Sequence, residues 1–329
     1  MSHANLARFV PHLGCPHQCS FCNQRHITGC TTIPNAKTVH DAVKIATSSK
    51  NYITSNAEIA FFGGSFTVID RNYMCELLEA ACEHIKNKSV AGIRVSTRPD
   101  CIDESVLTLL KKYGVTSIEL GAQSMCDRVL SANNRGHVAE DVVNASKLIK
   151  DFGFSLGLQM MTGLYKSSKE EDLYTADKII ELCPDTVRIY PTITLKDTYL
   201  ERLYLSGDYV PPSLDDAVML AAIIEDKFEK HSINVIRIGL HSIEEDSYVA
   251  GPWHPAFREL CESFKYRIEF DTLLVSGKNY NIYVNPSDVS KTIGQNRSNI
   301  DYFNSKNIKL KIIQDNSINK SQYRIEEVN

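Results

Sequence analysis

Short apolar runs rich in β-branched and aromatic residues recur through the first two thirds of the chain, and stretches with helical spacing separate them. Each run is continuous and brief, which is typical of a strand buried on both faces of a sheet. The predicted strands are Leu6–Pro11, Glu58–Gly63, Gly92–Thr97, Ser117–Ala122, Phe154–Met160 and Thr186–Pro191. The predicted helices between them are Val39–Ser48, Tyr73–Lys86, Glu104–Lys112, Val138–Asp151 and Glu170–Leu182. This alternation predicts an α/β fold, a partial (β/α)6 barrel around a parallel sheet.

The pattern changes after Pro191, where helical segments include a long predicted helix at about Leu214–Lys230. A strand at Asn234–Gly239 would close the barrel. The segment Gly251–Pro255 holds two prolines and a glycine, which suits a junction better than a helix or a central strand. We therefore predict a barrel domain over residues 1–250 and a small domain over residues 256–329. The small domain is predicted to contain a helix at Ala256–Phe264, strands near Arg267–Val275 and Tyr280–Val284, a helix from Pro286, a second helix to about Asn304, and a strand at Ile308–Ile313.

Composition narrows the class of protein. Hydrophobic residues make up 43% of the 329 residues and charged residues 23%, and no apolar run approaches the roughly 20 residues that cross a bilayer. The start of the chain is short and polar, unlike a signal peptide, so we expect a soluble, cytoplasmic protein without a membrane contact. The net charge of −4 gives no global basic field, but residues 278–324 hold eight Lys and Arg against three Asp and Glu.

Three of the ten cysteines lie within eight residues, at Cys15, Cys19 and Cys22. This clustering in a long chain without an export signal favours metal binding over a disulfide framework. A loop of that spacing can wrap three thiolates around one corner of a [4Fe–4S] cluster and leave the fourth iron open. S-adenosylmethionine (SAM) can chelate that iron. An electron from the cluster then cleaves SAM to methionine and a 5′-deoxyadenosyl radical. The alternatives are a zinc site completed by His17 or His26, or a group of buried thiols.

Polar groups follow abruptly on several of the predicted strands. Paired glycines in the segment FFGGSFT end the second strand, where exposed backbone can approach a ligand closely. The segments STRPD and ELGAQS end the third and fourth strands, NRGH follows, and Gln159 lies near the end of the fifth. Because the carboxyl ends of barrel strands build the active site, these groups can position ribose hydroxyls or a carboxylate. Taken singly, residues of these types are more often caps or solvated groups than ligand contacts, and their placement at successive strand ends favours the functional interpretation.

The segments CPHQCSFCNQ, FFGGSFT, STRPD, ELGAQS, NRGH and RIYPT resemble the radical SAM domain of the Elongator catalytic subunit and its shorter bacterial relatives. The resemblance covers about Phe9 to Ser242. It implies a TIM-like radical SAM barrel, a [4Fe–4S] cluster and SAM as cofactors, and cluster ligation by the cysteines named above. The residues that it implies around SAM or at the strand ends beside it are Gly63, Gly64, Ser65, Ser96, Arg98, Glu119, Gln123, Arg135, Arg188 and Tyr190.

The chain departs from the Elongator subunit after Pro255. That subunit carries an acetyltransferase-like domain, whereas this sequence has no Gly-rich acetyl-CoA loop and few residues beyond Pro255. The resemblance therefore does not carry over the carboxymethylation of wobble uridine. Other cysteines are candidates for a hydrogen-atom donor or a methyl carrier, or are inert buried thiols, and no catalytic residue is assigned among them. They are Cys30, Cys101, Cys126, Cys183 and Cys261.

Residues 284–300 resemble the helix–loop–helix of KH domains, whose GXXG loop clamps single-stranded nucleic acid. Here the fourth position of the tetrad is arginine, which can reach a phosphate, and nearby lysines add positive potential. The predicted RNA-binding residues are Lys291, Gly294, Gln295, Asn296, Arg297 and Lys309. The alternative is a small α+β domain that only caps the barrel.

These motifs leave three functions open. The first is a radical SAM enzyme that modifies RNA, with transfer RNA ahead of ribosomal RNA as partner and with an electron donor such as flavodoxin or ferredoxin. The second is a radical SAM enzyme that acts on a small metabolite or a peptide, with the tail as a lid. The third is a protein that keeps the cluster as a structural or regulatory element and binds RNA without turnover.

Overall fold

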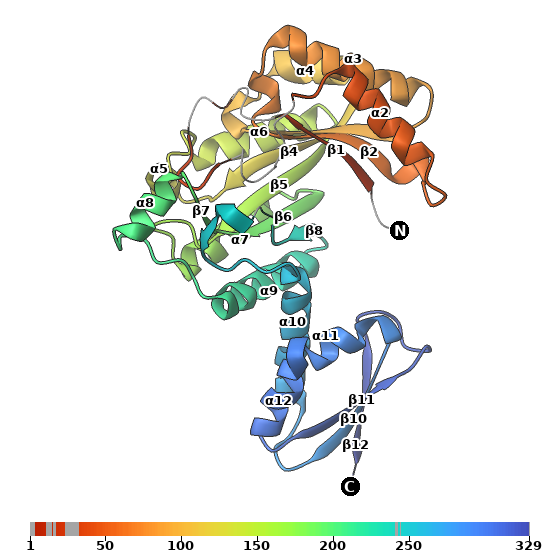
Figure 1. The fold of residues 1–329 in the computed structure, drawn as a ribbon, viewed down its shortest axis with the longest axis vertical. Helices are drawn as coiled ribbons and strands as arrows, with labels where there is room; N and C mark the ends of the chain where they lie inside the picture. The colour runs from red at the N-terminus through yellow and green to blue at the C-terminus, as the bar shows by residue number, and fades with distance from the viewer. Residues whose placement is uncertain are drawn as a thin grey trace.

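A curled sheet of parallel strands forms the larger part of the computed structural model, which describes residues 4–10, 15, 18–23, 33–240, 243 and 245–328. Its seven strands lie in the order β1-β2-β3-β4-β5-β6-β8 (Figure 1). They are β1 (Ala4–Val10), β2 (Ala57–Gly63), β3 (Gly92–Thr97), β4 (Val115–Gln123), β5 (Ser155–Thr162), β6 (Thr186–Pro191) and β8 (Asn234–Ile238). All neighbouring pairs are parallel. The predicted partial (β/α)6 barrel is confirmed, and β8 adds a seventh strand at one edge. The expectation that this strand closes the barrel was wrong, because β8 pairs with β6 and the described sheet has β1 at its opposite edge.

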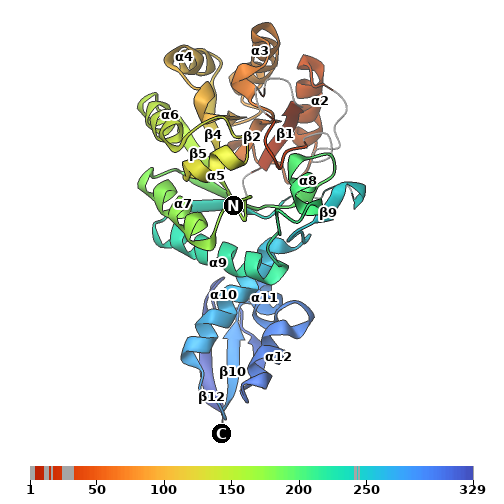
Figure 2. The ribbon, with the colours of Figure 1, turned by 90° about the vertical axis from the view of Figure 1, so that its left-hand side faces the viewer.

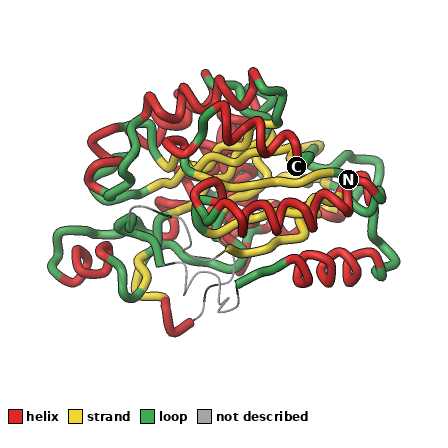
Figure 3. The backbone as a smooth tube through the Cα atoms, turned by 90° about the horizontal axis from the view of Figure 1, so that it is seen from above, coloured by secondary structure: helices red, strands yellow, loops and turns green. Residues whose placement is uncertain are grey.

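Helices form an arc around the outside of this sheet (Figures 2 and 3). They are α2 (Ala36–Thr47), α3 (Arg71–Lys86), α4 (Glu104–Lys112), α6 (Ala139–Asp151), α7 (Lys169–Glu181) and α9 (Leu214–Lys230). Each buries one apolar face against the strands, as α4 does with Leu107 and Leu110, both fully buried. The start of α4 is fixed by Asp103, whose carboxylate accepts the backbone N–H of Val106 at 2.8 Å.

Short elements gather beyond the carboxyl ends of the strands, on the left of Figure 1. These are the helices α5 (Asp127–Ala132) and α8 (Tyr199–Leu205) and the antiparallel pair of β7 (Thr194–Leu195) and β9 (Tyr248–Ala250). They cover the end of the barrel at which the predicted polar residues meet. No helix in the described part of the chain is both long enough and apolar enough to cross a membrane.

The end of the chain folds as a small α+β unit below the barrel in Figure 1. Its sheet has the order β11-β10-β12, and helices pack on one face of it. The elements are α10 (Phe257–Leu273), β10 (Asn279–Val284), α11 (Val289–Ile293), α12 (Ser298–Ser305), β11 (Lys309–Gln314) and β12 (Tyr323–Val328). Helix α10 contributes Phe257 and Cys261 to the core of the barrel, and Tyr266 and Phe270 to the core of the small unit. The division of the chain at residues 250–256 stays a prediction, and α10 belongs to both cores.

Two expectations for the small unit were wrong. The segment near Arg267–Val275 is not a strand, because α10 continues to Leu273 and buries Tyr266 and Phe270, one helical turn apart, against the sheet. The polar end of the chain contains a strand, β12, which had not been predicted. Its residues Tyr323 and Ile325 alternate with polar neighbours and reach the core of the small unit. This alternation covers only a few residues of a polar segment, so it gives a weak signal for a strand.

Candidate active site

A cavity of about 230 Å³ opens at the carboxyl ends of the barrel strands. Alternate residues of β5 and β6 face it, because side chains two apart on a strand share one side. These are Gln159 and Met161 on β5, and Arg188 and Tyr190 on β6. Cys22 of the predicted cluster loop lies on the same cavity. The structure therefore brings the cysteine motif and the last strand ends together, although they are far apart in the sequence.

The described part of the cysteine loop is held against the barrel by backbone hydrogen bonds. The N–H of Ser20 donates to the carbonyl of Asn133 at 3.0 Å, and the Ser20 carbonyl accepts the N–H of Leu200 at 2.8 Å. The Ser20 hydroxyl also donates to the Asn133 side chain at 2.6 Å. A closing turn joins the N–H of Cys22 to the carbonyl of Cys19 at 3.1 Å. The ends of α5 and α8 thus fix where the loop places its thiols.

Each of the two earlier cysteines has a polar neighbour among the predicted SAM residues. Arg135 donates from its guanidinium to the Cys19 sulfur at 3.2 Å, and the Cys15 sulfur lies 3.7 Å from the hydroxyl of Ser65. A guanidinium beside the sulfur complements the negative charge that a cluster-binding cysteine carries. His17 and His26, the ligands of the zinc alternative, lie outside the described residues, as does Cys30.

A cluster and SAM fit the chemistry of the groups at this end of the barrel. Within the described ranges, no three His, Cys, Asp or Glu side chains are already gathered as a metal cage. Four buried polar atoms near the cysteines nevertheless have no hydrogen-bond partner in the described part of the protein. They are Ser96 Oγ, Arg98 Nη1, Gln123 Oε1 and Arg135 Nε. Buried polar atoms are seldom left unpaired, so this set indicates a polar ligand of the kind that SAM provides.

The partners of these four residues show how they are positioned. Arg98 makes a two-pronged pair with Asp100 at 2.9 and 3.0 Å and also donates to the backbone carbonyl of Arg135. Gln123 follows an irregularity in the pairing of β4 with β5 and adopts a positive φ of 65°. An uncommon backbone conformation at the end of a strand is a frequent feature of functional sites. His137 nearby is neutral at pH 7, because burial and the charge of Arg135 lower its pKa to about 4.

The glycine pair has a structural role in addition to its predicted contact with SAM. Gly63 has a φ of 117°, and a Cβ there would come within 2.6 Å of the carbonyl oxygen of Val10 on β1. The N–H of Gly64 donates to that same carbonyl at 3.0 Å. Close approach of β1 to β2 thus requires glycine at position 63. Ser65, which follows, is buried beside Cys15.

Glu119 lies inside the barrel and is engaged on both carboxylate oxygens. Arg188 donates to them at 2.9 and 3.0 Å, Arg94 at 3.1 Å, and Gln159 at 2.9 Å. Arg94 in turn pairs with Glu58 at 2.8 Å. The guanidinium of Arg188 lies 5.2 Å from the centre of the Phe62 ring, a cation–π distance. The predicted role of Glu119 around the ribose or carboxylate of SAM stays a prediction. Its contacts in the structure position Arg188 and Gln159, which line the cavity.

Sequence reasoning missed several residues that line the cavity. Phe9 and Phe62 come from β1 and β2, and Ile193 and Leu195 from the segment that follows β6. The two phenylalanines lie near the ends of predicted strands. Because alternate residues of a strand face the same side, this alternation could have placed them at the cavity. Ile193 and Leu195 gave no such signal, because their position depends on the pairing of β7 with β9, which lie far apart in the sequence.

The predicted RNA-binding tetrad joins α11 to α12. Gly294 is buried with a φ of 79°, and a Cβ there would meet the backbone N of Asn299 at 2.9 Å. Gln295, Asn296 and Arg297 are exposed. Arg297 has a φ of 65°, a left-handed conformation that favours the glycine found there in KH loops.

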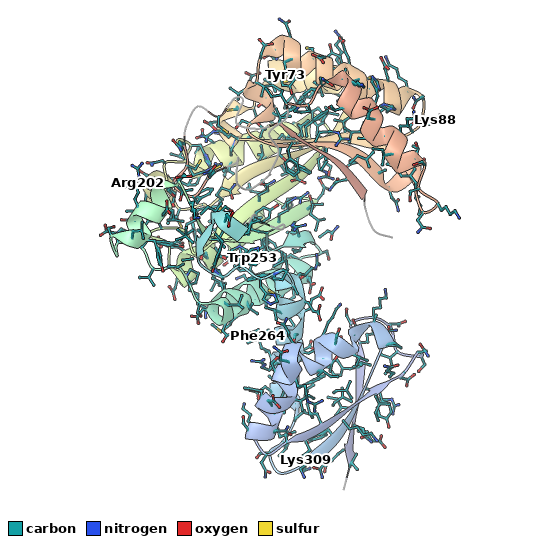
Figure 4. All side chains as sticks on the ribbon, viewed as in Figure 1. Tyr73, Lys88, Arg202, Trp253, Phe264 and Lys309 are labelled. Atoms are coloured by element: carbon teal, nitrogen blue, oxygen red, sulfur yellow. The ribbon has the colours of Figure 1, made fainter. Side chains whose placement is uncertain are left out.

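The two lysines predicted to bind RNA differ in their surroundings. Lys291 pairs with Glu262 at 2.9 Å and with Asp288 at 3.4 Å. Lys309 is exposed at the start of β11, at the end of the small unit farthest from the barrel (Figure 4). RNA binding by these residues stays a prediction, and Lys291 reaches a phosphate only by leaving its carboxylates.

The chain belongs to the radical SAM superfamily. The family model "Radical SAM superfamily" matches residues 9–179, and "Radical_SAM C-terminal domain" matches residues 184–266. Members of this family use a [4Fe–4S] cluster and SAM, which confirms the two predicted cofactors. When bound, they would be held by the three cysteines and by the groups at the ends of β2, β3 and β4.

Within the superfamily the chain is similar to Elongator-type proteins. It is 29% identical over 179 residues to the tRNA uridine(34) acetyltransferase of Dehalococcoides mccartyi, covering 48% of this chain and 39% of that protein. An uncharacterized protein of Methanocaldococcus jannaschii is 27% identical over 258 residues, covering 74% of this chain and 77% of its own. The fold matches archaeal Methanocaldococcus infernus Elp3 with a TM-score of 0.68 at 20% identity, covering 82% and 64% of the two chains. The predicted Elongator-like resemblance is confirmed. The chain spans about two fifths of the acetyltransferase named first.

Replacement of Gln123 by alanine is expected to weaken SAM binding about tenfold while leaving thermal stability almost unchanged. Its amide oxygen is buried and unpartnered in the described structure, so the protein loses little when the amide is removed and SAM loses a hydrogen bond. SAM affinity by calorimetry and the melting temperature of the same sample test this. A large fall in melting temperature with normal SAM affinity would assign Gln123 to the fold.

Proposed function

We propose that this chain is a radical SAM enzyme that modifies RNA, with transfer RNA as the first candidate and ribosomal RNA as the second. The observation that carries the proposal is the combination of an Elongator-like barrel with a small α+β unit that exposes a KH-like tetrad. Similarity to tRNA uridine(34) acetyltransferases supports transfer RNA. The small unit would bind the RNA and present one base or ribose to the mouth of the barrel.

The chemistry divides between the cofactors and the residues of the cavity. When bound, the cluster and SAM supply a 5′-deoxyadenosyl radical by one-electron cleavage of the sulfonium. The rings of Phe9, Phe21 and Phe62 keep water from the reacting group. Burial raises the pKa of the Tyr190 phenol, which therefore stays protonated and can donate a hydrogen bond to the substrate.

Two further parts of the proposal concern partners and place. Each SAM cleavage consumes one electron, so the protein would need a donor such as flavodoxin or ferredoxin. Such donors, transfer RNA and ribosomes share the cytoplasm, which is the location that we propose.

The proposal is tested by comparing nucleosides from RNA of cells with and without the gene. We expect one modified nucleoside to disappear without the gene and to return when the purified, reconstituted protein acts on that RNA with SAM and a reductant. Identical nucleoside profiles would contradict the proposal.

A radical SAM enzyme that acts on a small metabolite or a peptide is the second candidate. The observation that favours this second function is the size of the cavity, about 230 Å³, which suits a small metabolite as well as a single nucleobase. Under this function the small unit would serve as a lid. Unchanged RNA nucleosides together with SAM cleavage stimulated by a small-molecule extract would support it.

Hydrolysis of acetyl-CoA by this chain is not expected, with or without transfer RNA. The described residues after Pro255 form the helices α10, α11 and α12 on a three-stranded sheet, and no Gly-rich acetyl-CoA loop occurs among them. Release of free CoA thiol, followed with a thiol-reactive dye, measures this. RNA-stimulated release from a pure sample would show that the acetyltransferase chemistry of its relatives is present after all.

A further inference from the structure

The sheet of the small unit has one covered and one uncovered face. Helices α10, α11 and α12 pack on one side only, as Figure 1 shows. Along β10 the side chains alternate, so that Tyr280, Ile282 and Val284 are buried beneath these helices. Asn281 and Tyr283 point to the other face, which no described residue of the barrel or the tail covers. We call this second side the open sheet face, made of the outward residues of β10, β11 and β12.

Two lysines on the open sheet face are not engaged by any acid in the described structure. Lys309 and Lys311 are alternate residues of β11, both exposed, and they pair in register with Asn279 and Asn281 of β10. Three other lysines of the small unit have carboxylate partners: Lys278 pairs with Glu327, Lys291 with Glu262 and Lys306 with Asp271. Lys309 and Lys311 are therefore a row of cationic groups that is free to meet an anion.

A fixed aromatic–cation pair lies beside this row. The guanidinium carbon of Arg324 is 3.8 Å from the centre of the Tyr283 ring, which is a stacking distance. The phenol of Tyr283 donates to the carboxylate of Glu326 at 2.6 Å, which holds the ring in place on the central strand. Both Arg324 and Glu326 are outward residues of β12, in register with Tyr283 and Asn281.

We propose that the open sheet face binds single-stranded RNA, with Tyr283 and Arg324 as a stacking surface for a base and with Lys309 and Lys311 on the phosphates. Neighbouring strands lie about 4.8 Å apart, so one nucleotide can reach both the lysine row and the ring. Planar bases and a charged backbone are the ligand that aromatic platforms with flanking cations bind. Among the described residues of 309–328, two acids contact residues of this face: Glu326 accepts the Tyr283 hydroxyl, and Asp315 pairs with Arg324 at 3.6 Å. Three cationic groups outnumber them, and Lys309 and Lys311 carry the charge left for phosphate.

This site differs from the KH-like tetrad, which lies in the turn between α11 and α12 on the helical side of the unit. The inference rests on the proposed RNA substrate and places a second contact on that RNA. Because the open sheet face is remote from the cavity, it would hold a segment away from the modified nucleotide. It should therefore affect the KM for RNA more than kcat.

The test is binding of the full-length protein to a fluorescein-labelled, ten-nucleotide single-stranded RNA of mixed sequence, followed by anisotropy at several salt concentrations. We expect Tyr283→Ala to weaken binding about tenfold, since stacking on an aromatic ring contributes on the order of 1–3 kcal/mol per base. Tyr283→Phe keeps the ring and should bind nearly as well as wild type. Lys309→Ala with Lys311→Ala should weaken binding and make the log–log salt slope shallower by about 1.4, which corresponds to two phosphate contacts.

The control is Lys37→Ala with Lys44→Ala on α2, which removes the same charge from exposed positions of the barrel and should leave affinity and slope unchanged. Circular dichroism and melting temperature confirm that each variant is folded. Wild-type affinity for the Tyr283→Ala and double-lysine variants would overturn the inference while leaving the RNA substrate in place. A wild-type protein with no affinity for this RNA or for transfer RNA would overturn the proposed function as well.

Discussion

Replacing any one of Cys15, Cys19 or Cys22 with alanine is expected to abolish both the iron–sulfur cluster and the cleavage of SAM. Each change removes one of three thiolates, and a cluster with two protein ligands is not retained. The surroundings of Cys19 hold its sulfur in place: the residue is 7% exposed, and the sulfur accepts a hydrogen bond from Arg135 at 3.2 Å. Iron and sulfide content after anaerobic reconstitution, and 5′-deoxyadenosine formed on reduction, measure the loss.

Cys183→Ala is the matched control for these variants. Cys183 is an exposed free thiol between α7 and the amino end of β6, whereas the site lies at the carboxyl ends of the strands, so its removal should leave iron content and SAM cleavage as in wild type. A cysteine variant of the N-terminal loop that keeps a full cluster would remove that residue from the ligand set. Full occupancy by zinc with no iron in the wild type would revive the zinc site with His17 or His26.

Glu119→Ala is expected to destabilise the barrel by about 3–5 kcal/mol, the effect of breaking a buried ion pair from one side. The substitution leaves the buried guanidiniums of Arg94 and Arg188 without the carboxylate that lies 2.9–3.1 Å from them. Arg94 keeps Glu58, so most of the loss should come from Arg188. Urea unfolding of the cofactor-free protein measures it as a shift of the midpoint.

Glu181→Ala provides the surface comparison, since its pair with Lys178 is largely exposed and screened by solvent, and it is expected to leave the urea midpoint almost unchanged. The same pair of variants separates the two roles of Glu119. An unchanged urea midpoint with a large loss of SAM affinity would assign Glu119 to the cofactor, as the family resemblance implies. A large shift of the midpoint assigns it to the support of the cavity.

Most of the barrel could be predicted from the sequence because its signals are local. Buried parallel strands are continuous apolar runs, and caps such as Asp103 mark where helices begin. The small unit was harder, because its elements are short and depend on long-range pairing. The residues of α10 around Phe270 suit a strand as well as a helix. The helix forms there because it packs Phe270 against the sheet of the small unit. Strand β12 places only alternate residues in the core of the small unit, and its other residues are polar because no helix covers that face of the sheet.

The parts of the candidate site that could be predicted are those whose functional residues lie close together in the sequence. The cysteine motif and the strand-end motifs predicted a [4Fe–4S] cluster and SAM, and the family match confirms both cofactors. The contacts that arrange these residues are long-range and leave no sequence signal, such as Ser20 with Asn133 or Glu119 with Arg188. For the same reason the sequence did not show that Lys291 is held by Glu262, or that Tyr283 and Arg324 form a stacked pair.

The most direct test of the central claim, a radical enzyme that acts on RNA, is deuterium transfer from RNA to 5′-deoxyadenosine. The reconstituted and reduced protein is incubated with SAM and with RNA from cells that lack the gene and were grown in deuterated medium. We expect 5′-deoxyadenosine that carries one deuterium atom, because the 5′-deoxyadenosyl radical takes a hydrogen atom from the bound RNA. Unlabelled 5′-deoxyadenosine, formed at the same rate with and without that RNA, would contradict the account.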